Sequence, residues 1–366
     1  MTASFEHPLT PDFADSSVRL DSNGATLYAP RPPPLPLPLP LLQAPPPTRQ
    51  APPPATRQAL RPLHIVTPLL EAEIAGRRVG LKLENLQPAR SFKLRGIGRL
   101  CRYYADQGVE RFVCSSAGNA GYAVAWAGRA LGIPVTVVLP RCTPGFVRQR
   151  IAALGAEIQA VGDVWDQANA AAVQLARHPG CAFIPPFDHP LLWQGHASLV
   201  QELAQQCRAP PDAILLAVGG GGLLLGVLEG LRSVGWNDTR VFAVEPEGAA
   251  ALAPSLLAGE VVELAAPRSI ASSLCVRRVA ASVVSACDGH KVTPLSVSDD
   301  QATAACVRLA EDHGLVVEPA CGATLAPLYA RHPALADAKH IVAIVCGGIV
   351  VTLDQLAGWR QSGVAA

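Results

Sequence analysis

The chain has 366 residues and a formal net charge of +1, with 49% hydrophobic and 16% charged residues. This composition allows two compact lobes or one large α/β domain, and it argues against nucleic acid as the main partner because phosphate binding needs clustered Lys and Arg. No apolar run reaches the roughly 18 residues of a membrane span. The first residues carry Glu6, Asp12 and Asp15 without an apolar signal-peptide stretch, so we expect a cytosolic protein that binds no membrane.

Residues 1–60 differ in composition from the rest of the chain. Thirteen of the 25 residues from Pro30 to Pro54 are proline, which excludes a helix or a central strand. We expect a disordered extension that samples polyproline II. The run Pro33-Pro34-Leu35-Pro36 could dock on a proline-recognition domain, but an extension without a partner is the simpler interpretation.

From about Leu60, short β-branched runs alternate with Ala- and Leu-rich helical stretches. The alternation predicts an α/β fold with mostly parallel sheets and helices on both faces. The expected strands are residues 78–84, 111–115, 135–139, 157–161, 182–184, 213–218, 241–244 and 341–345. The expected helices are residues 94–104, 120–131, 146–154, 165–177, 194–207, 223–234, 299–313 and 323–329. Ligands of such sheets bind at the carboxyl ends of the strands.

Lys93 is one of only four lysines, against 26 arginines. It follows a turn-rich run, residues 85–91, and begins an expected helix. The helix dipole disfavours a protonated amine at this position, which lowers the pKa from about 10.4. A free amine is what a Schiff-base lysine needs. A solvated surface lysine is the alternative for Lys93 taken alone.

Three loops that follow expected strands carry polar or glycine-rich sequences. Residues 115–121, Ser-Ser-Ala-Gly-Asn-Ala-Gly, lie before a helix and suit a carboxylate, although an ordinary turn capped by Ser116 is equally consistent. The four glycines 219–222 predict a backbone cradle for a phosphate, and the pattern fits neither a Walker loop nor a dinucleotide fingerprint. Cys346 follows the last strand, where a thiol could contact an aromatic ring nitrogen or pack in the core. The ten cysteines include no Cys-x-x-Cys pair, so no structural zinc site is expected.

Together these residues resemble the fold-type II pyridoxal-phosphate enzymes, the tryptophan synthase β-like fold, and within them the L-serine dehydratase/L-threonine deaminase family. The resemblance covers about residues 62–356. It rests on Ser91-Phe92-Lys93-Leu94-Arg95-Gly96, Ser115-Ser116-Ala117-Gly118-Asn119-Ala120-Gly121, Ile184-Pro185-Pro186-Phe187-Asp188, Gly195-His196-Ala197-Ser198, Val218-Gly219-Gly220-Gly221-Gly222-Leu223, Glu318-Pro319-Ala320-Cys321-Gly322-Ala323 and Val345-Cys346-Gly347-Gly348. It implies a catalytic domain at residues 61–360, with a small lobe at about 93–190 and a large lobe formed by 61–92 and 191–360.

The resemblance also implies roles for individual residues. Lys93 would join pyridoxal 5'-phosphate as a Schiff base and, once freed, act as the base for the Cα proton. The other cofactor-binding residues would be Phe92 at the ring, Asn119 at the ring hydroxyl, Gly219, Gly220, Gly221, Gly222 and Leu223 at the phosphate, and Cys346 at the ring nitrogen. The substrate carboxylate would bind Ser116, Ala117, Gly118 and Ala120. A potassium site would use Glu245, Ala249, Leu274 and Val276.

The implied activity is α,β-elimination of L-serine and L-threonine to pyruvate and 2-oxobutanoate with ammonia. The implied protein is a cytoplasmic homodimer acting in amino-acid catabolism and gluconeogenesis. Ala117 predicts no appreciable racemisation, because similar racemases carry a serine acid/base there. A β-replacement enzyme of the cysteine-synthase type is an alternative, although such enzymes usually have a serine in place of Cys346.

A third possibility is a non-catalytic or weakly active copy that uses the proline-rich extension for docking. The chain departs from the family pattern at several positions. Ile349 and Val350 replace the usual Ser-Asn, Arg90 stands where glycine is common, and Ala251 and Cys275 replace a serine and a glycine near the cation site. These departures put cofactor affinity and potassium dependence in question.

Overall fold

The computed structural model describes residues 62–362. The predictions for the proline-rich extension, including docking by residues 33–36, lie outside this range. Within it, two β-sheets are each flanked by helices, as the alternating pattern predicts.

The larger sheet has six strands in the order β1-β2-β10-β7-β8-β9, and the smaller sheet has four in the order β5-β4-β3-β6. Their bounds are β1 (Leu69–Ile74), β2 (Arg77–Lys82), β3 (Arg111–Cys114), β4 (Val135–Leu139), β5 (Glu157–Ala160), β6 (Cys181–Phe183), β7 (Ala213–Ala217), β8 (Arg240–Pro246), β9 (Val292–Val297) and β10 (Ile341–Ile344). The pair β1–β2 is antiparallel and every other pair is parallel. The predicted α/β class with mostly parallel sheets is therefore confirmed.

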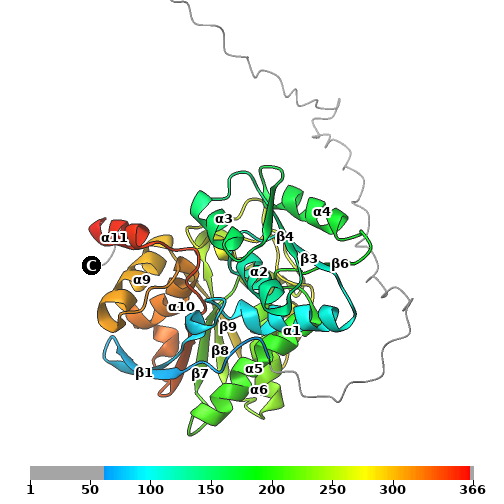
Figure 1. Cartoon of the computed structure of the whole chain (residues 1–366). Coiled ribbons are helices and arrows are strands. Elements are labelled where there is room, and N and C mark those ends of the chain that lie inside the picture. Colours follow the sequence, from blue (N-terminus) through cyan, green and yellow to red (C-terminus); the bar gives the residue numbers. More distant parts are fainter. Residues whose placement is uncertain (1–61, 363–366) are drawn as a thin grey trace, which may run out of the picture. The chain divides into compact units, whose positions relative to one another are not determined.

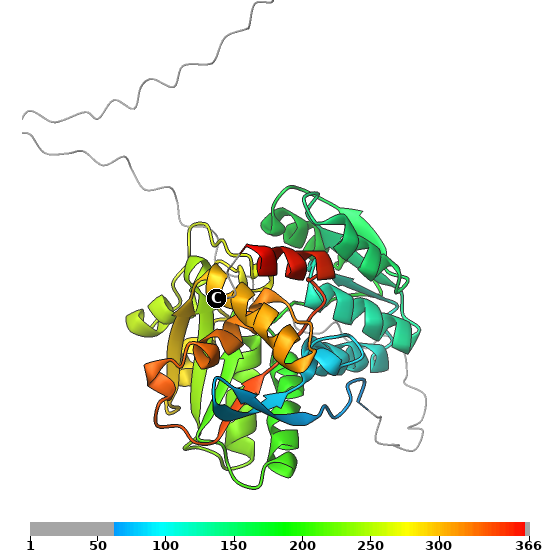
Figure 2. The same ribbon diagram turned by 90° about the vertical axis from the view of Figure 1, so that its left-hand side faces the viewer.

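The helices α1 to α10 lie between successive strands, and α11 follows β10. Their bounds are α1 (Lys93–Asp106), α2 (Asn119–Leu131), α3 (Gly145–Ala152), α4 (Trp165–Leu175), α5 (Pro190–Gln206), α6 (Gly222–Ser233), α7 (Leu252–Ala258), α8 (Val283–Cys287), α9 (Asp299–His313), α10 (Pro319–Tyr329) and α11 (Leu353–Gln361). Figure 1 shows α2, α3 and α4 beside the smaller sheet, and Figure 2 shows the same arrangement from the side.

Alternating side chains explain how the smaller sheet holds a helix on each face. Phe112 and Val137 lie in the apolar cluster that includes α2, whereas Val113 and Val138 pack with Ala168 of α4. Successive residues of a strand point to opposite faces, so both faces of β3 and β4 must be apolar. These strands accordingly appear as continuous β-branched runs in the sequence.

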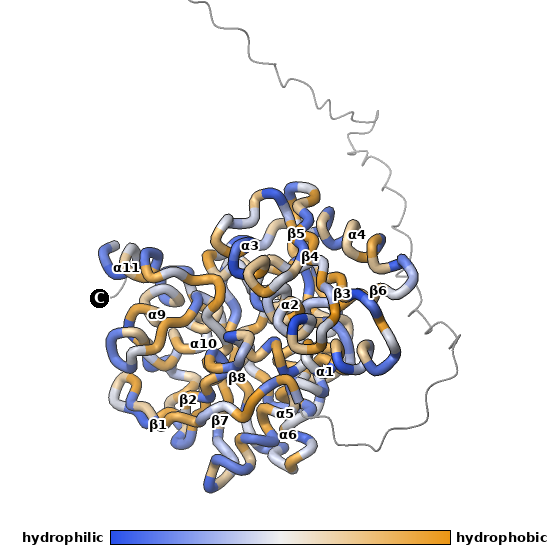
Figure 3. Tube along the Cα trace, viewed as in Figure 1, coloured by the Kyte–Doolittle hydropathy of each residue, from blue (hydrophilic) through white to orange (hydrophobic). Residues whose placement is uncertain are grey.

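The inner strands of the larger sheet are buried throughout. All residues of β7 and β10 are buried, and Figure 3 shows hydrophobic residues concentrated in the interior strands, with hydrophilic ones on outer elements such as α11. The carboxyl end of β7 leads into the four glycines, and that of β10 leads to Cys346. Two of the loops singled out in the sequence therefore follow neighbouring strands of one sheet.

Five elements were not predicted: β1, β9, α7, α8 and α11. In β1, charged Glu71 and Glu73 interrupt the apolar run, as an edge strand with a solvent face allows. In β9, Pro294 argues against a strand, but β9 is the other edge of the sheet, where proline is tolerated. The short helices α7 and α8 carry too few turns for a periodic signal.

Candidate functional site

Lys93 is the first residue of α1, the position that the sequence indicates. Its Nζ donates a hydrogen bond of 2.7 Å to the carbonyl oxygen of Pro186 and lies 5.1 Å from the centroid of the Phe92 ring. Burial lowers the pKa of Lys93 to about 8, and nearby Cys346 and Glu318 oppose that shift. A pKa near 8 leaves a useful fraction of free amine near neutral pH, and desolvation is its leading cause.

The glycine loop between β7 and α6 has no room for side chains. A Cβ at Gly220 would lie 2.4 Å from the Phe187 ring, and Gly221, the residue before α6, has a φ of +83°. The first N–H groups of a helix have no partner within the helix, and the dipole there is positive. The loop therefore presents unpaired N–H groups of the kind that bind phosphate.

Asn119 begins α2 and is 6% exposed. Its Nδ2 donates a 2.7 Å hydrogen bond to Oε1 of Glu318, which comes from the far side of the site just before α10. Its Oδ1 is buried and has no hydrogen-bond partner among the described residues. An unpaired buried acceptor costs about 1–3 kcal/mol, so a ligand that donates to this oxygen would be favoured.

Cys346 is the second residue after β10 and is 5% exposed. A hydrogen bond with Cys321 and burial raise the pKa of Cys346 well above its usual value. The residue therefore stays a neutral thiol. Its carbonyl oxygen accepts a 3.0 Å hydrogen bond from the N–H of Phe92, which places it beside the Lys93 turn.

Two series of contacts join the glycine loop to the remaining residues. On one side, Phe187 lies against Gly220 and Gly222, and the preceding Pro186 accepts the Lys93 bond. On the other side, a Cβ at Gly219 would lie 2.9 Å from Leu274, whose neighbour Ser273 donates to Glu318. Residues from distant parts of the sequence thus surround one site.

The loop 116–118 borders this site and is partly exposed. The N–H of Gly118 donates to the Ser116 hydroxyl over 3.3 Å, and the N-terminus of α2 with its unpaired N–H groups follows at once. Val350 comes close to this loop, because a Cβ at Gly118 would lie 3.8 Å from its Cγ1. The placement is compatible with binding a substrate carboxylate between Ala117 and Ala120, which stays a prediction.

Of the candidate potassium residues, Glu245 is bonded to the start of α7. Oε1 and Oε2 of Glu245 accept hydrogen bonds of 2.7 and 2.9 Å from the N–H groups of Leu252 and Ala253. Burial raises the pKa of Glu245. The carbonyl oxygen of Leu274 accepts from the N–H of Val276. Potassium binding by Glu245, Ala249, Leu274 and Val276 stays a prediction.

Arg90, one of the departures from the family pattern, has a φ of 58°. This is the left-handed region, which costs a non-glycine residue roughly 1–2 kcal/mol. Glycine, the usual residue at this position, adopts this φ without strain. In this chain Arg90 adopts it, and its carbonyl oxygen accepts a hydrogen bond from the N–H of Gly348.

Two residues that belong to the site received no role from the sequence. Glu318 and Phe187 stand in motifs that carry the resemblance, but neither was assigned a function. Glu318 is fully buried, and a buried carboxyl without a cationic partner is costly unless several donors reach it. An acidic residue at the start of an otherwise apolar helix is the signal that could have pointed to it.

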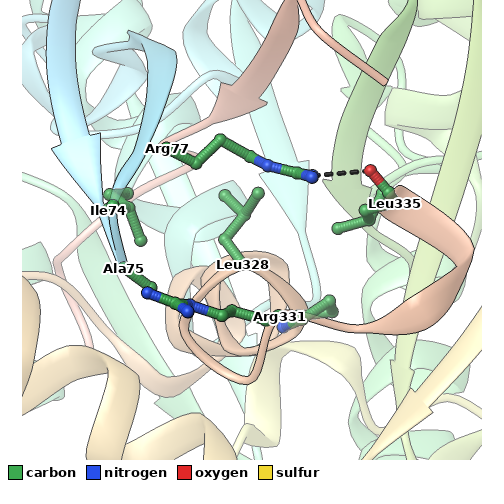
Figure 4. Close-up of a pocket in the computed structure, with 8 residues that line it drawn as sticks. Ile74, Ala75, Arg77, Leu328, Arg331 and Leu335 are labelled. Atoms are coloured by element: carbon green, nitrogen blue, oxygen red, sulfur yellow. Dashed lines mark hydrogen bonds between the residues drawn. The ribbon is translucent and has the colours of Figure 1, made fainter. Parts of the chain in front are cut away.

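A separate pocket of 230 Å³ lies between the β1–β2 turn and the end of α10, and contains none of these residues. Figure 4 shows Arg77 reaching across it to the carbonyl oxygen of Leu335. That arginine holds the chain after α10 in place, so its role there is structural. Within residues 62–362, no helix is long and apolar enough to cross a bilayer, and no group of three His, Cys, Asp or Glu side chains is arranged for a metal ion.

The main site fits pyridoxal phosphate on three features of the structure. The glycine loop, which packs against Phe187, can bind the phosphate. The amine of Lys93 has a lowered pKa and can react with an aldehyde. The buried Oδ1 of Asn119 has no partner among the described residues and can accept a hydrogen bond from a ligand. The neutral Cys346 thiol can contact a ring nitrogen without carrying charge.

Comparison with known proteins agrees with this fit. The family model "Pyridoxal-phosphate dependent enzyme" matches residues 60–347. The chain is 47% identical to human "Serine dehydratase-like" over 299 residues, 78% of this chain and 91% of that protein. It is 42% identical to human "L-serine dehydratase/L-threonine deaminase", with 82% and 95% covered. A fungal L-serine ammonia-lyase structure from Rhizomucor miehei superposes with a TM-score of 0.77 at 38% identity, covering 82% of this chain and 98% of that one. The chain therefore belongs to the family of pyridoxal-phosphate dependent enzymes.

Proposed function

We propose that this protein catalyses the α,β-elimination of L-serine, and of L-threonine, to pyruvate or 2-oxobutanoate and ammonia. The relatives named L-serine dehydratase, L-threonine deaminase and L-serine ammonia-lyase support this assignment. The observation that carries it is the neutral thiol of Cys346 just after β10, next to the turn that carries Lys93, because the Cys346 carbonyl oxygen accepts a hydrogen bond from the N–H of Phe92.

Lys93, Phe92, Asn119, Cys346 and residues 219–223 would hold the cofactor. When bound, pyridoxal phosphate supplies an electron-withdrawing ring that acidifies the Cα proton of the substrate. A thiol cannot hold a proton on the ring nitrogen as a carboxylate would, so negative charge at Cα is weakly stabilised and rapid loss of the β-hydroxyl is favoured.

The chain's own groups then have distinct tasks. The N–H groups at the start of α2, with Ser116 and Gly118, bind and orient the substrate carboxylate. Lys93 Nζ takes the Cα proton, and its pKa of about 8 matches a base working near neutral pH. The β-hydroxyl leaves, and together with the proton taken from Cα it makes up one molecule of water. The released 2-aminoacrylate then takes up water and hydrolyses to pyruvate and ammonia. Ala117 offers no acid or base on the opposite side of Cα, so the substrate is not racemised.

The deciding experiment incubates purified full-length protein, loaded with pyridoxal phosphate, with L-serine and L-threonine, and measures 2-oxo acid and ammonia. We expect both products in equal amounts, and D-serine formation far slower than elimination. Protein that is yellow but inactive on both amino acids would favour β-replacement, which a sulfide donor with L-serine or O-acetyl-L-serine would reveal. D-serine formed as fast as pyruvate would contradict the role given to Ala117.

Assembly, location and cation dependence complete the proposal. We propose a cytoplasmic homodimer, with potassium bound by Glu245 and the carbonyl groups of Ala249, Leu274 and Val276. Sedimentation would test the dimer, and activity in potassium compared with tetramethylammonium buffers would test the cation.

A further inference from the structure

Ser115 joins β3 to the loop 116–118 and is bonded to two side chains of α4. The indole Nε1 of Trp165 donates a 2.8 Å hydrogen bond to the Ser115 carbonyl oxygen, and the Ser115 hydroxyl donates a 2.6 Å bond to Oδ1 of Asn169. Ser115 is fully buried, whereas Trp165 is 43% exposed. The direction of the Trp165 bond is certain from its chemistry, because an indole N–H can only donate and a carbonyl oxygen can only accept.

The spacing along α4 explains why both side chains reach the same residue. Trp165 and Asn169 are four residues apart and therefore lie on one face of the helix. Ala168, on the same side of α4, is buried in one apolar cluster with Val113 of β3. This packing fixes the helix relative to the strand that ends just before Ser115. The two bonds to Ser115 thus come from a rigid element and not from another loop.

The loop 116–118 lies between the bonded Ser115 and the first turn of α2. A Cβ at Gly121 would collide with the Ser116 carbonyl oxygen, so α2 leaves no free space on its side of the loop. At the other end, the Trp165 bond fixes the direction of the Ser115 carbonyl group. Because a peptide unit is planar, this bond also fixes the orientation of the whole peptide between Ser115 and Ser116, at which the loop begins.

We propose that Trp165 is a positioning residue for the substrate carboxylate, which it orients by holding the peptide at the start of the loop 116–118, with Asn169 in support. The inference rests on the proposed function in one respect, namely that this loop and the start of α2 bind a carboxylate. Without the indole N–H, the loop populates arrangements that do not fit the carboxylate, and ligand binding has to restore the one that does. Affinity falls accordingly, whereas proton transfer at Cα is not affected.

The experiment compares two amines on the full-length protein loaded with pyridoxal phosphate. L-Alanine carries a carboxylate, ethylamine is the same amine without it, and neither has a β-hydroxyl to lose. The change in the visible absorption of the bound cofactor gives the Kd of each. For Trp165→Phe, which keeps an aromatic ring but removes the N–H, we expect the Kd of L-alanine to rise about 3- to 10-fold, the equivalent of one hydrogen bond. The Kd of ethylamine should stay unchanged.

Trp193→Phe is the matched control. The indole Nε1 of Trp193 also donates to a backbone carbonyl oxygen, that of Phe187 beside the glycine loop, over 2.9 Å. The substitution removes the same kind of bond near the proposed phosphate site, so the ratio of the two Kd values should stay at the wild-type value. Asn169→Leu, which removes the partner of the Ser115 hydroxyl, should raise the Kd of L-alanine selectively, as Trp165→Phe does.

Steady-state kinetics with L-serine separate positioning from general structural support. The loss of a contact that serves binding alone should raise KM and leave kcat nearly unchanged in Trp165→Phe. An unchanged Kd of L-alanine in this variant, an equal rise for both amines, or a selective rise in Trp193→Phe would overturn the proposal. Wild-type protein that binds both amines equally would remove the carboxylate site and the inference with it. A selective effect of Trp165→Phe in a protein inactive on L-serine would leave this inference standing and remove the proposed reaction.

Discussion

Two buried polar clusters begin two residues apart on α1, and they differ in how completely their groups are paired. In the first, Arg95 bonds both oxygens of Glu84 and both of Glu202 at 2.6–2.7 Å. Lys82 adds a 2.7 Å bond to Glu202, and the Thr67 hydroxyl donates to Glu84. In the second, the Oδ1 of Asn119 has no partner, and the Lys93 amine bonds only a carbonyl oxygen among the described residues.

The difference separates a structural network from a ligand site. A fully paired buried network fixes the elements that it joins, here β2, α1 and α5, and has no capacity left for a ligand. A partly paired one is costly in the empty protein, so its persistence indicates that another molecule completes it. If burial and charge were the only criteria, Arg95 would be a stronger candidate for a ligand-binding residue than Lys93. The unpaired atoms around Lys93 make Lys93 the stronger candidate.

The largest expected effect comes from removing the amine of the incomplete cluster. Lys93→Ala should lower the rate of 2-oxo acid formation by at least about 10³-fold, because both the covalent attachment and the base are lost. The visible absorption of the bound cofactor should disappear, while the urea midpoint should not fall. Lys339→Ala, at an exposed position, is the control. Retained visible absorption in Lys93→Ala would place the attachment elsewhere.

A substitution in the fully paired cluster around Arg95 should lower stability rather than remove the cofactor attachment. Arg95→Met leaves Glu84 and Glu202 buried without their main partner and should reduce the free energy of unfolding by about 3–5 kcal/mol. Urea denaturation measures the loss, with cofactor spectra recorded on the folded fraction. Arg360→Met, which removes an exposed 2.8 Å pair with Glu311, should cost no more than about 1 kcal/mol. Equal effects in the two variants would contradict a special role for the network.

The stability of the cofactor-free protein should depend on pH through Lys93, which distinguishes the incompletely paired cluster from the Arg95 cluster. Its folded pKa of about 8 lies below the unfolded value of about 10.4. Between these values the unfolded state binds more protons, so stability rises with pH, and the full penalty applies below about pH 8. Urea denaturation at several pH values should show this rise as a difference between wild type and Lys93→Ala. The rate of covalent cofactor capture should also increase through pH 8; an increase centred near pH 10 would contradict the buried amine.

The sequence predicted the parts of this site that depend on local structure. Lys93 at a helix start and the four glycines that lead into α6, the last of them its first residue, follow from turn and helix signals within a few residues, and the structure has both at these positions. The partners of Asn119 were beyond such reasoning, because Glu318 is 199 residues away in the chain. The Arg95 network was missed for the same reason, since Glu84, Glu202 and Lys82 are brought together only by tertiary packing.

The smallest effect concerns the segment after Cys346, where Ile349 and Val350 depart from the family pattern. Arg150 of α3 donates to the carbonyl oxygens of Ile349 and Val351, and the Val350 side chain packs with the apolar cluster of the smaller sheet. These contacts tie the segment that follows the larger sheet to the smaller one.

Arg150→Met should therefore cost about 1 kcal/mol of stability, the net worth of a typical hydrogen bond. Hydrogen exchange should show faster exchange at residues 349–351 and at the N–H that reaches Glu318, while the buried strands β7 and β10 stay protected. Arg148→Met, on the same helix, is the control. Unchanged exchange at residues 349–351 would show that apolar packing of Val350 holds the segment without the arginine.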